Sequence, residues 1–489
     1  MMPKFQLAAA LLCAASSLAW CAEIPVTPAD DLRALILSAE VGDELVLAPG
    51  DYAIDAVEIS QSLTIRSTDG SDATSLTVRQ SQLAPTFGFL RLIAPSGVQL
   101  EGLTLRREGE DLLPLLATAG PVAAIDIAFH SDPHAVSLAG ALPSRFVDCE
   151  FEGGGGVFMS RGVAASFERC AFIGNDAPFG TDVVKLLFKD CEFRDNRSAV
   201  RATGDVSVID SVFIGNSASG FGGALQFGLP GSATISGCTF ENNTSPDTGA
   251  VSCPSSLSQP VIQNCVFRNN RGGSIANHVS LAIHGNFSNN LIIDTEPTNG
   301  LPAVASGVAV ANNTFVGPSD ADAGPAFATD IATFVTNNIV RGYGARAIDP
   351  DRTAGAIFRN NNIEGAASIE GLHPSNFDAD PLFVDPASGD YRLSPGSTSI
   401  DAGVNRYVGA DMLDLDADMN ILEPTPGDAI GATRVVDGDN DHVARVDLGA
   451  FEYDPRAGEE PCIADFSGDN RLDIADVVAF LQAFGAGCP

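Results

Sequence analysis

Apolar and polar residues alternate over short stretches in most of the first 375 residues, and turn residues separate these stretches. Alternation with a period of two is typical of a β-strand that buries one face. In the segment 233–243, the residues expected to point inward are Ala233, Ile235, Cys238 and Phe240, and those expected to point outward are Thr234, Ser236 and Thr239. The two-residue gap between Ile235 and Cys238 interrupts the alternation and predicts a bend between two strands.

This unit recurs every 20 to 27 residues. Its inward position, two residues before a phenylalanine, holds Cys149, Cys170, Cys191, Ser211, Cys238 and Cys265. Farther along the chain, the corresponding position holds Asn290, Asn313, Asn338 and Asn362. A second series lies five residues after the first: Asn175, Asn196, Asn216, Asn243 and Asn270. A short repeat of strand-forming residues at this period predicts a solenoid whose like side chains stack.

The spacing between stacked strands indicates whether the cysteines of neighbouring coils can form disulfides. Neighbouring strands lie about 4.8 Å apart, which is farther than the roughly 3.8 Å between the Cβ atoms of a disulfide. We therefore expect buried thiols that act as small apolar residues. One residue after this position, an outward column becomes apolar toward its end: Ala171, Val212, Val266, Leu291, Ile339 and Ile363. Such a column predicts a cover, and the segment that follows the repeats is the candidate.

Both ends of the repeat region carry distinct segments. Residues 27–40 predict one helix, with Thr27 as its cap and an apolar stripe that includes Leu32 and Ile36. Two strand-like runs with Pro-Gly-x-Tyr follow at 41–52, and Ser-Leu-Thr-Ile follows at 62–65. This order resembles the N-terminal cap of pectate-lyase-like right-handed parallel β-helices. The resemblance implies an all-β fold, a right-handed parallel β-helix over residues 24–375.

The C-terminal part divides into two segments. The stretches 378–403 and 437–453 resemble the tail of secreted bacterial β-helix proteins of the choice-of-anchor type. That resemblance implies that residues 376–454 close the end of the solenoid. Residues 462–489 are expected to form a separate small module, and the cysteines that bracket it, Cys462 and Cys488, are expected to pair.

The small module contains a calcium-loop pattern. Oxygen ligands fall at loop positions 1, 3, 5, 7, 9 and 12, namely Asp465, Ser467, Asp469, Arg471 (through its carbonyl), Asp473 and Asp476. An amphipathic helix follows the loop. The segment resembles one dockerin repeat, which implies bound Ca²⁺ and a cohesin-like partner. Position 6 is Asn470 rather than glycine, and the chain has one such repeat where cohesin-binding dockerins usually have two.

Composition narrows the possible functions. Residues 1–19 read as a secretory signal peptide, with Lys4 before an apolar stretch and small residues before Trp20. No later apolar stretch is long enough for a transmembrane helix, so we expect a secreted or cell-surface protein. The net charge of -35 argues against nucleic-acid binding, which needs clustered basic residues, and it suits cation binding.

Four groups of residues could carry chemistry. One is the basic coil of Lys185, Lys189, Arg194, Arg197 and Arg201, which Asp182, Asp190, Glu192 and Asp195 could equally neutralise. Two others are His278 and His284 with Asp294, and His130 and His134 with Asp132. All of these histidines could equally be structural. The fourth comprises the acidic runs Asp411, Asp414, Asp416, Asp418 and Asp437, Asp439, Asp441, whose alternation is that of calcium ligands. They could form a second calcium site within 411–441, although no matching bidentate acid accompanies them.

Two functions follow from the sequence. The first is binding of polysaccharide or cell-surface glycans along the flank of the solenoid. The alternative is a polysaccharide lyase or glycoside hydrolase that acts on uronate-rich polysaccharide, which needs a base and a group that neutralises the uronate carboxylate. The Asn-Thr-Asp, Gly-His-Gly and Arg-Ile-Lys strings of galacturonases are absent from the chain. Titratable residues that converge in one groove on adjacent coils would favour the enzyme.

Overall fold

The computed structural model describes part of the chain. It covers residues 21–456 except for 81–87, 110–112, 131–134, 140–141, 155, 160–162, 177–178, 182–184, 198–199, 229–230, 254–259, 274–275, 282–284, 297–300, 306–308, 320–324, 330–332, 345–346, 350, 352, 354, 410, 412–418 and 421–422. The signal peptide and the calcium-loop module therefore lie outside the described residues. So do Asp132, His134, Asp182, His284, Asp414, Asp416 and Asp418.

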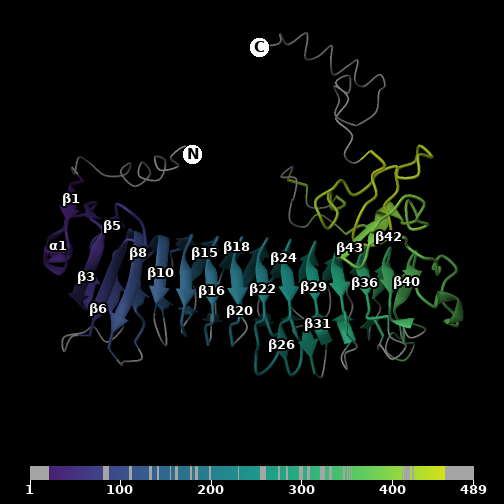
Figure 1. Ribbon diagram of the computed structural model, residues 1–489, viewed down its shortest axis with the longest axis horizontal. Coiled ribbons are helices and arrows are strands. Elements are labelled where there is room, and N and C mark those ends of the chain that lie inside the picture. Colours follow the sequence, from purple (N-terminus) through teal and green to yellow (C-terminus); the bar gives the residue numbers. More distant parts are fainter. Residues whose placement is uncertain are drawn as a thin grey trace, which may run out of the picture.

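The described chain winds as a parallel β-helix with three faces, and each turn of three strands is called a coil below (Figure 1). The first face consists of β1 (Glu23–Val26), β2 (Glu44–Leu47), β5 (Thr64–Ser67), β12 (Ser144–Val147), β15 (Ala164–Glu168), β18 (Lys185–Lys189), β21 (Asp205–Ile209), β24 (Ala233–Ser236), β28 (Val261–Gln263), β32 (Asn286–Ser288), β35 (Ala309–Ala311), β38 (Phe334–Thr336) and β40 (Ile357–Arg359).

The second face follows the first within each coil. It consists of β3 (Gly50–Asp55), β6 (Thr74–Arg79), β13 (Glu150–Glu152), β16 (Ala171–Ile173), β19 (Glu192–Arg194), β22 (Val212–Ile214), β25 (Thr239–Glu241), β29 (Val266–Arg268), β33 (Leu291–Ile293), β36 (Thr314–Val316), β39 (Ile339–Arg341) and β41 (Asn362–Ile363). Two long strands, β8 (Val98–Glu108) and β10 (Val122–His130), run through both faces and join them into one sheet.

The third face is a separate 12-stranded parallel sheet. Its strands are β4 (Val57–Ile59), β7 (Leu90–Leu92), β9 (Leu116–Thr118), β11 (Val136–Leu138), β14 (Val157–Met159), β17 (Phe179–Thr181), β20 (Val200–Thr203), β23 (Leu225–Gly228), β27 (Val251–Cys253), β31 (Ala276–Leu281), β34 (Leu301–Ala305) and β37 (Phe327–Ala328). A short parallel pair, β26 (Thr244–Ser245) with β30 (Arg271–Gly272), extends two of the coils.

The bend between the first and second faces lies where the alternation breaks. In each of these coils, the first residue of the bend has a left-handed backbone, with φ between 49° and 66°. These residues are Asp126, Asp148, Arg169, Asp190, Asp210, Gly237, Asn264, Asn289, Asn312, Asn337 and Asn360. Glycine, asparagine and aspartate tolerate this conformation best, which explains why they fill almost every position of the column.

The interior confirms the predicted stacking. The ladder cysteines Cys149, Cys170, Cys191, Cys238 and Cys265 are buried, and none of them forms a disulfide. Beside them, the rings of Phe151 and Phe172 stack with centroids 4.7 Å apart, and those of Phe172 and Phe193 are also 4.7 Å apart. Asparagine side chains continue the column, because Asn290 Oδ1 accepts a hydrogen bond from the backbone N–H of Cys265 at 2.9 Å.

Two register expectations were wrong by one residue. Asn361, not Asn362, continues the ladder, because its Oδ1 accepts from the backbone N–H of Asn338 at 2.9 Å. Asn362 pairs with Ile339 on the outward side, and Ile363 points into the core. The sequence reads Asn-Asn-Asn at 360–362, so the correct register could not be read from residue type alone.

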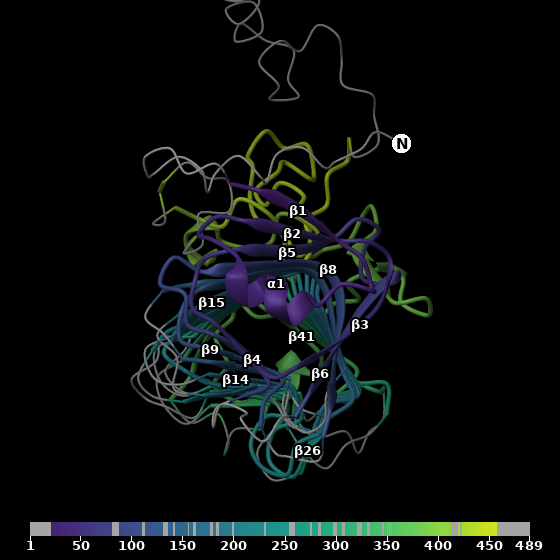
Figure 2. The same ribbon diagram turned by 90° about the vertical axis from the view of Figure 1, so that its left-hand side faces the viewer.

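The N-terminal helix is shorter than predicted. The helix α1 runs from Leu32 to Ser38, and Asp31 rather than Thr27 is its N-cap, accepting a hydrogen bond from the N–H of Ala34 at 3.0 Å. Residues before it form β1, which pairs with β2. Leu32 and Ile36 join the core, and Figure 2 shows α1 at the N-terminal opening of the solenoid. Among the described residues, no helix is long and apolar enough to cross a bilayer.

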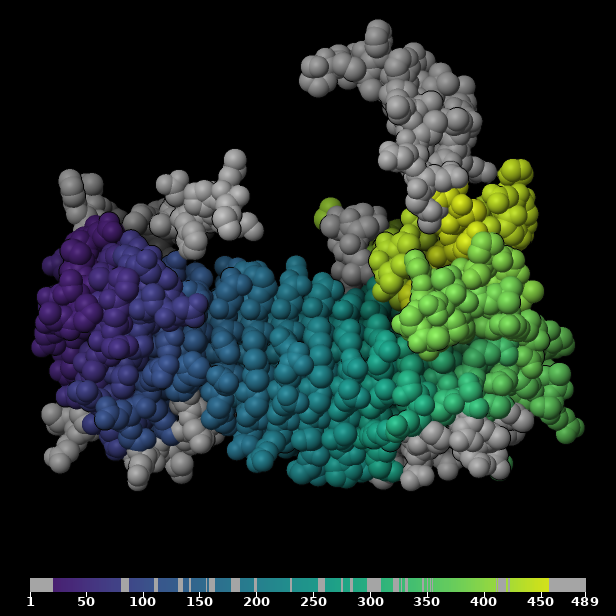
Figure 3. Space-filling model, in the orientation of Figure 1, coloured from purple at the N-terminus to yellow at the C-terminus, as the bar shows by residue number. Residues whose placement is uncertain are grey.

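The region after the repeats folds back along the solenoid instead of lying only at its end (Figure 3). It contains the antiparallel pair β42 (Phe383–Asp385) and β43 (Asp390–Leu393) and the short 3-10 helices η3 (Ala366–Ser368) and η4 (Asn405–Tyr407). Tyr391 and Phe451 pack on Leu291 and Ile293. Leu393 and Leu448 pack on Ile339. The predicted cover of the apolar outward column is confirmed.

Candidate functional site

A pocket of about 380 Å³ opens on the second face near the N-terminal end of the solenoid. Its polar lining comprises Asp51, Ser71, Asp72, Thr74, Ser75, Thr77, Thr104 and Arg106. The strands β3, β6 and β8 place Asp51, Ser75, Thr77, Thr104 and Arg106 on one outer face, because residues two apart on a strand point to the same side. Ser71 and Asp72 come from the turn before β6, and Thr74 is buried at the start of that strand. We call this the N-terminal pocket.

Side chains beneath the pocket hold one of its walls in place. The carboxylate of Asp126 accepts hydrogen bonds from the backbone N–H of Ser71 at 3.1 Å and from its hydroxyl at 2.8 Å. The hydroxyl of Thr104 donates to the carbonyl of Ser71 at 2.7 Å. The turn 69–73 is thus tied to two neighbouring coils, and the pocket is formed without a ligand.

Three titratable side chains follow one another on adjacent coils beside this pocket. Arg106, His130 and Glu152 occupy the same outward register position on β8, β10 and β13. The Nδ1 atom of His130 lies 3.5 Å from a carboxylate oxygen of Glu152. Arg106 is exposed, and among the described residues no carboxylate oxygen lies within 4.0 Å of its guanidinium. We call these residues the Arg–His–Glu row.

The row places a cation, an imidazole and a carboxylate in line along an outer face. The guanidinium can bind a carboxylate or hydroxyl groups of a ligand. The imidazole can exchange a proton, and a neighbouring carboxylate orients it. Sequence analysis considered His130 only with Asp132 and His134. The row itself was missed, although its spacings of 24 and 22 residues fall within the range of the repeat.

Described carboxylates pair with two of the five basic side chains of the basic coil. Arg194 pairs with Glu192 on its own strand, and Arg197 approaches Asp176 at 3.5 Å. One coil earlier, Arg169 binds both oxygens of Asp148, at 2.6 and 2.8 Å. Lys185, Lys189 and Arg201 are exposed. Among the described residues, Glu192 is the one expected partner that forms such a pair, and Asp176 is a partner that the sequence did not suggest.

His278 is a structural residue of the interior. It is fully buried, its Nδ1 lies 3.0 Å from Asn270 Nδ2, and its Nε2 lies 3.0 Å from Asp294 Oδ1. Asp294 is also buried, so neither side chain is open to a substrate. The histidine and the aspartate therefore end the second asparagine ladder.

The described residues of the two acidic runs, Asp411, Asp437, Asp439 and Asp441, do not all lie in one cluster. Carboxylate oxygens of Asp437 and Asp439 come within 4.8 Å of one another and of Asp401, which the sequence did not suggest. Both oxygens of Asp401 accept backbone hydrogen bonds, from Asp439 at 2.7 Å and Arg445 at 3.2 Å. Asp411 is buried elsewhere in the same region. Among the described residues, the geometry thus joins only part of the predicted second calcium site.

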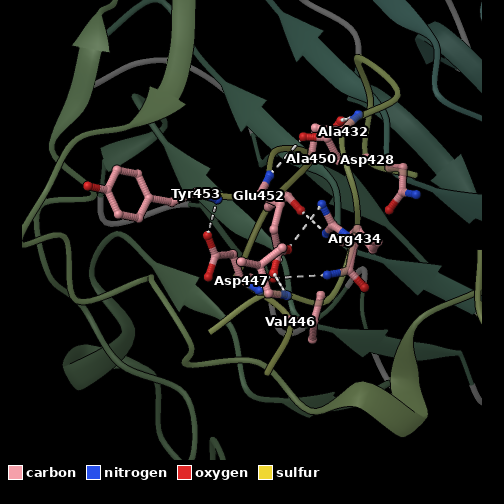
Figure 4. Close-up of polar contacts among 12 residues, drawn as sticks. Asp428, Ala432, Arg434, Val446, Asp447, Ala450, Glu452 and Tyr453 are labelled. Atoms are coloured by element: carbon pink, nitrogen blue, oxygen red, sulfur yellow. Dashed lines mark hydrogen bonds and ion pairs between the residues drawn. The ribbon is translucent and has the colours of Figure 1, made fainter. Parts of the chain in front are cut away.

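A buried group of charges organises the C-terminal region (Figure 4). Arg434, Asp428, Asp447 and Glu452 are almost completely buried. An Arg434 nitrogen lies 3.9 Å from Glu452, and all three carboxylates accept backbone N–H groups. Burial raises the pKa of Asp447 to about 7 and raises the pKa of Glu452 well above its usual range.

Comparisons with known proteins support the fold. A family model described as a right-handed β-helix region matches residues 134–315. No curated protein sequence matches the chain. Similar solved structures include one described as ORF18 of Geobacillus virus E2, at 14% identity and a TM-score of 0.38, covering 47% of this chain and 50% of that one.

Two further structures are lyases by their descriptions. A variant of the PL6 family alginate lyase AlyGC shares 14% identity at a TM-score of 0.41, covering 77% of this chain and 56% of that one. A PL6 family polysaccharide lyase from Pseudopedobacter saltans shares 12% identity at a TM-score of 0.35, covering 77% of this chain and 97% of that one. The chain spans about half the length of the first two structures.

Proposed function

We propose that this protein binds polysaccharide or cell-surface glycans outside the cell, and that the N-terminal pocket is its binding site. The pocket carries the proposal, because Asp51, Asp72 and Arg106 bring hydrogen-bond acceptors and donors to one opening. Carboxylates accept from sugar hydroxyls and a guanidinium donates to them in a fixed geometry. The parallel coils also present a long, regular flank on which an extended chain can lie.

The test is a binding screen of the secreted protein against soluble polysaccharides, with Arg106→Ala as the variant. We expect about tenfold weaker binding, as is common when a central charged contact is lost. Arg145→Ala is the matched control, because Arg145 is exposed on the first face and pairs with Glu168. Equal loss in both variants, or no binding to any polysaccharide by the unchanged protein, would contradict the proposal.

The Arg–His–Glu row favours a second candidate, a lyase that acts on uronate-rich polysaccharide. Arg106 would neutralise the uronate carboxylate, and His130 would take the proton from the adjacent carbon. The electron pair of that C–H bond would form the new C=C bond as the glycosidic C–O bond breaks. The departing oxygen would then receive a proton from the imidazolium. Glu152 is a positioning residue that orients His130.

Product absorbance distinguishes the two candidates. Appearance of an unsaturated product from polyuronate, lost in His130→Gln, supports the lyase. Glu152→Gln should then lower kcat and leave KM nearly unchanged, because the amide orients the imidazole less well but does not contact the substrate. Tight binding of polyuronate with no product, unchanged in His130→Gln, would rule out the lyase and leave the binding function.

We propose further that residues 1–19 direct secretion and that residues 462–489 bind Ca²⁺ as a dockerin-like module, with a cohesin-like partner. The alternating ligands Asp465, Asp469 and Asp476 support the calcium site. Titration calorimetry of the full chain should detect one calcium fewer in the double variant Asp465→Ala/Asp476→Ala. An unchanged stoichiometry would refute this site.

A further inference from the structure

A groove of about 700 Å³ lies where the C-terminal region meets the solenoid. Its floor belongs to the bend and second face of three coils, and its wall to the segment 426–433. The lining residues are Ile209, Asp210, Ser236, Gly237, Cys238, Thr239, Asn264, Val266, Pro426, Gly427, Asp428, Ala429, Ile430, Gly431 and Thr433. We call this the junction groove.

The wall is fixed without a ligand. One carboxylate oxygen of Asp428 accepts hydrogen bonds from the N–H groups of Ile430 and Ala432, both at 2.9 Å, and the other accepts from Glu452 at 2.9 Å. The side chain of Asn289 donates to the carbonyl of Gly427 at 3.1 Å and joins the wall to the solenoid. A preformed site loses less entropy on binding than one that must be ordered.

The chemistry of the lining is polar but almost uncharged. Its described lining residues include no lysine, arginine or histidine, and Asp210 is their one exposed carboxylate, since Asp428 is buried and hydrogen-bonded. The hydroxyl of Thr239 and the amide of Asn264, both half-buried, can supply hydrogen bonds, while Ser236 is buried. The Asn264 Oδ1 atom is buried and has no hydrogen-bond partner among the described residues.

Aliphatic side chains complete the surface. Ile209 and Val266 lie on the floor, and Ile430 stands on the wall with 62% of its surface exposed. An exposed aliphatic residue beside hydrogen-bonding groups suits a ligand that has both hydroxyl groups and apolar C–H faces. A sugar ring has both.

We propose that the junction groove binds a neutral glycan. An anionic chain is disfavoured, because no cation lines the groove, Asp210 faces it and the whole chain carries a net charge of -35. A strand-adding peptide is also disfavoured, because the strands that line the floor are already paired on both sides. The ligand class differs from the uronate of the lyase candidate, so this inference does not rest on it.

The two sites are separate. Thr104 in the N-terminal pocket and Thr239 in the junction groove belong to one outward row, joined through Ala128, Glu150, Ala171, Glu192 and Val212. Six register steps of about 4.8 Å place them roughly 29 Å apart. One site can therefore be changed without altering the other.

The test measures binding of soluble β-glucan, galactomannan and xylan to the full chain by affinity electrophoresis. Thr239→Trp fills the floor of the groove and should weaken binding by about tenfold or more. Thr234→Trp is the matched control, because Thr234 faces outward on the same coil but does not line the groove. Melting curves of both variants verify that each is folded.

Arg106→Ala separates this inference from the proposed function. We expect it to leave neutral-glycan binding unchanged and to weaken only binding at the N-terminal pocket. The inference is overturned if no neutral glycan binds, if Thr239→Trp binds as the unchanged protein does, or if polyuronate competes fully for the groove.

Discussion

At the scale of single residues, buried asparagine side chains form hydrogen bonds with backbone groups that would otherwise be unpaired. The Nδ2 atom of Asn243 donates to the carbonyl of Phe213 at 2.9 Å and to Asn270 Oδ1 at 2.8 Å. Its Oδ1 accepts from the backbone N–H of Asn216 at 3.0 Å. Each side chain thus joins three coils, and a ladder of such residues leaves few buried polar groups unpaired.

We expect Asn243→Leu to lower the free energy of unfolding by about 3 kcal/mol, because it leaves several buried groups without partners. Asn242→Gly is the control: Asn242 is exposed and left-handed, and glycine accepts that backbone without strain. Denaturant unfolding monitored by circular dichroism measures both. Equal stability of the two variants would show that the ladder contributes little.

The buried charges of the C-terminal region make stability depend on pH. The pKa values of Asp447 and Glu452 are raised above their unfolded values, chiefly by burial. Each folded carboxyl group therefore keeps its proton at a pH where the unfolded one has lost it. This contribution to stability is complete below the unfolded pKa, near 4, and is lost as pH rises to about 7 for Asp447.

Glu452→Gln removes one of these titrations and should flatten the pH dependence. The many other carboxylates also titrate, so the informative quantity is the difference in the free energy of unfolding between variant and unchanged protein at each pH. We expect this difference to move in favour of the variant between pH 5 and 8, by about 1 kcal/mol or more. A difference independent of pH would mean that Glu452 is ionised throughout.

At the scale of elements, the strands and bends were predictable from the sequence. The strands follow from the alternation of apolar and polar residues, and the bends follow from residues that tolerate a left-handed backbone. The buried thiols followed from the spacing of stacked strands. Boundaries were less accurate: Asp31 caps α1, since Thr27 lies in the turn before it and hydrogen-bonds Asp30. The Arg–His–Glu row was missed because a site in a solenoid combines residues a whole coil apart. The junction groove depends on where the C-terminal region docks, which no local pattern encodes.

Two adjacent residues of α1 allow a test of whether this helix seals the N-terminal end of the core. Ile36 is fully buried against the solenoid, and Leu37, the next residue, is 52% exposed. Ile36→Ala should cost about 2–4 kcal/mol of unfolding free energy through lost burial and the cavity left behind, and Leu37→Ala should cost under 0.5 kcal/mol. If the two substitutions cost the same, α1 does not seal the core, and a role as an end cap is excluded.

At the scale of the whole molecule, the C-terminal region is a cover for an apolar flank. Its Tyr391, Leu393, Leu448 and Phe451 bury Leu291, Ile293 and Ile339 on the second face. In the earlier coils, the same outward position alternates between polar residues (Glu150, Glu192 and Thr239) and the smaller apolar residues Ala171 and Val212. The asparagines of the bend take part as well, since Asn312 donates to Asp447 O at 3.1 Å. The larger apolar residues in this outward column of the second face therefore mark where the C-terminal region docks.

A chain that ends at residue 380 should expose this flank and associate. Uncovered Leu291, Ile293 and Ile339 would form a contiguous apolar patch of the kind that drives self-association. We expect light scattering to report a larger mass for the truncated chain than for the full chain at equal concentration. Leu291→Thr with Ile339→Thr, which imitates Thr239 and Thr314 of the same row, should restore the smaller mass. A truncated chain that stays as small as the full chain would mean that the flank needs no cover, and the region would then serve to build the wall of the junction groove.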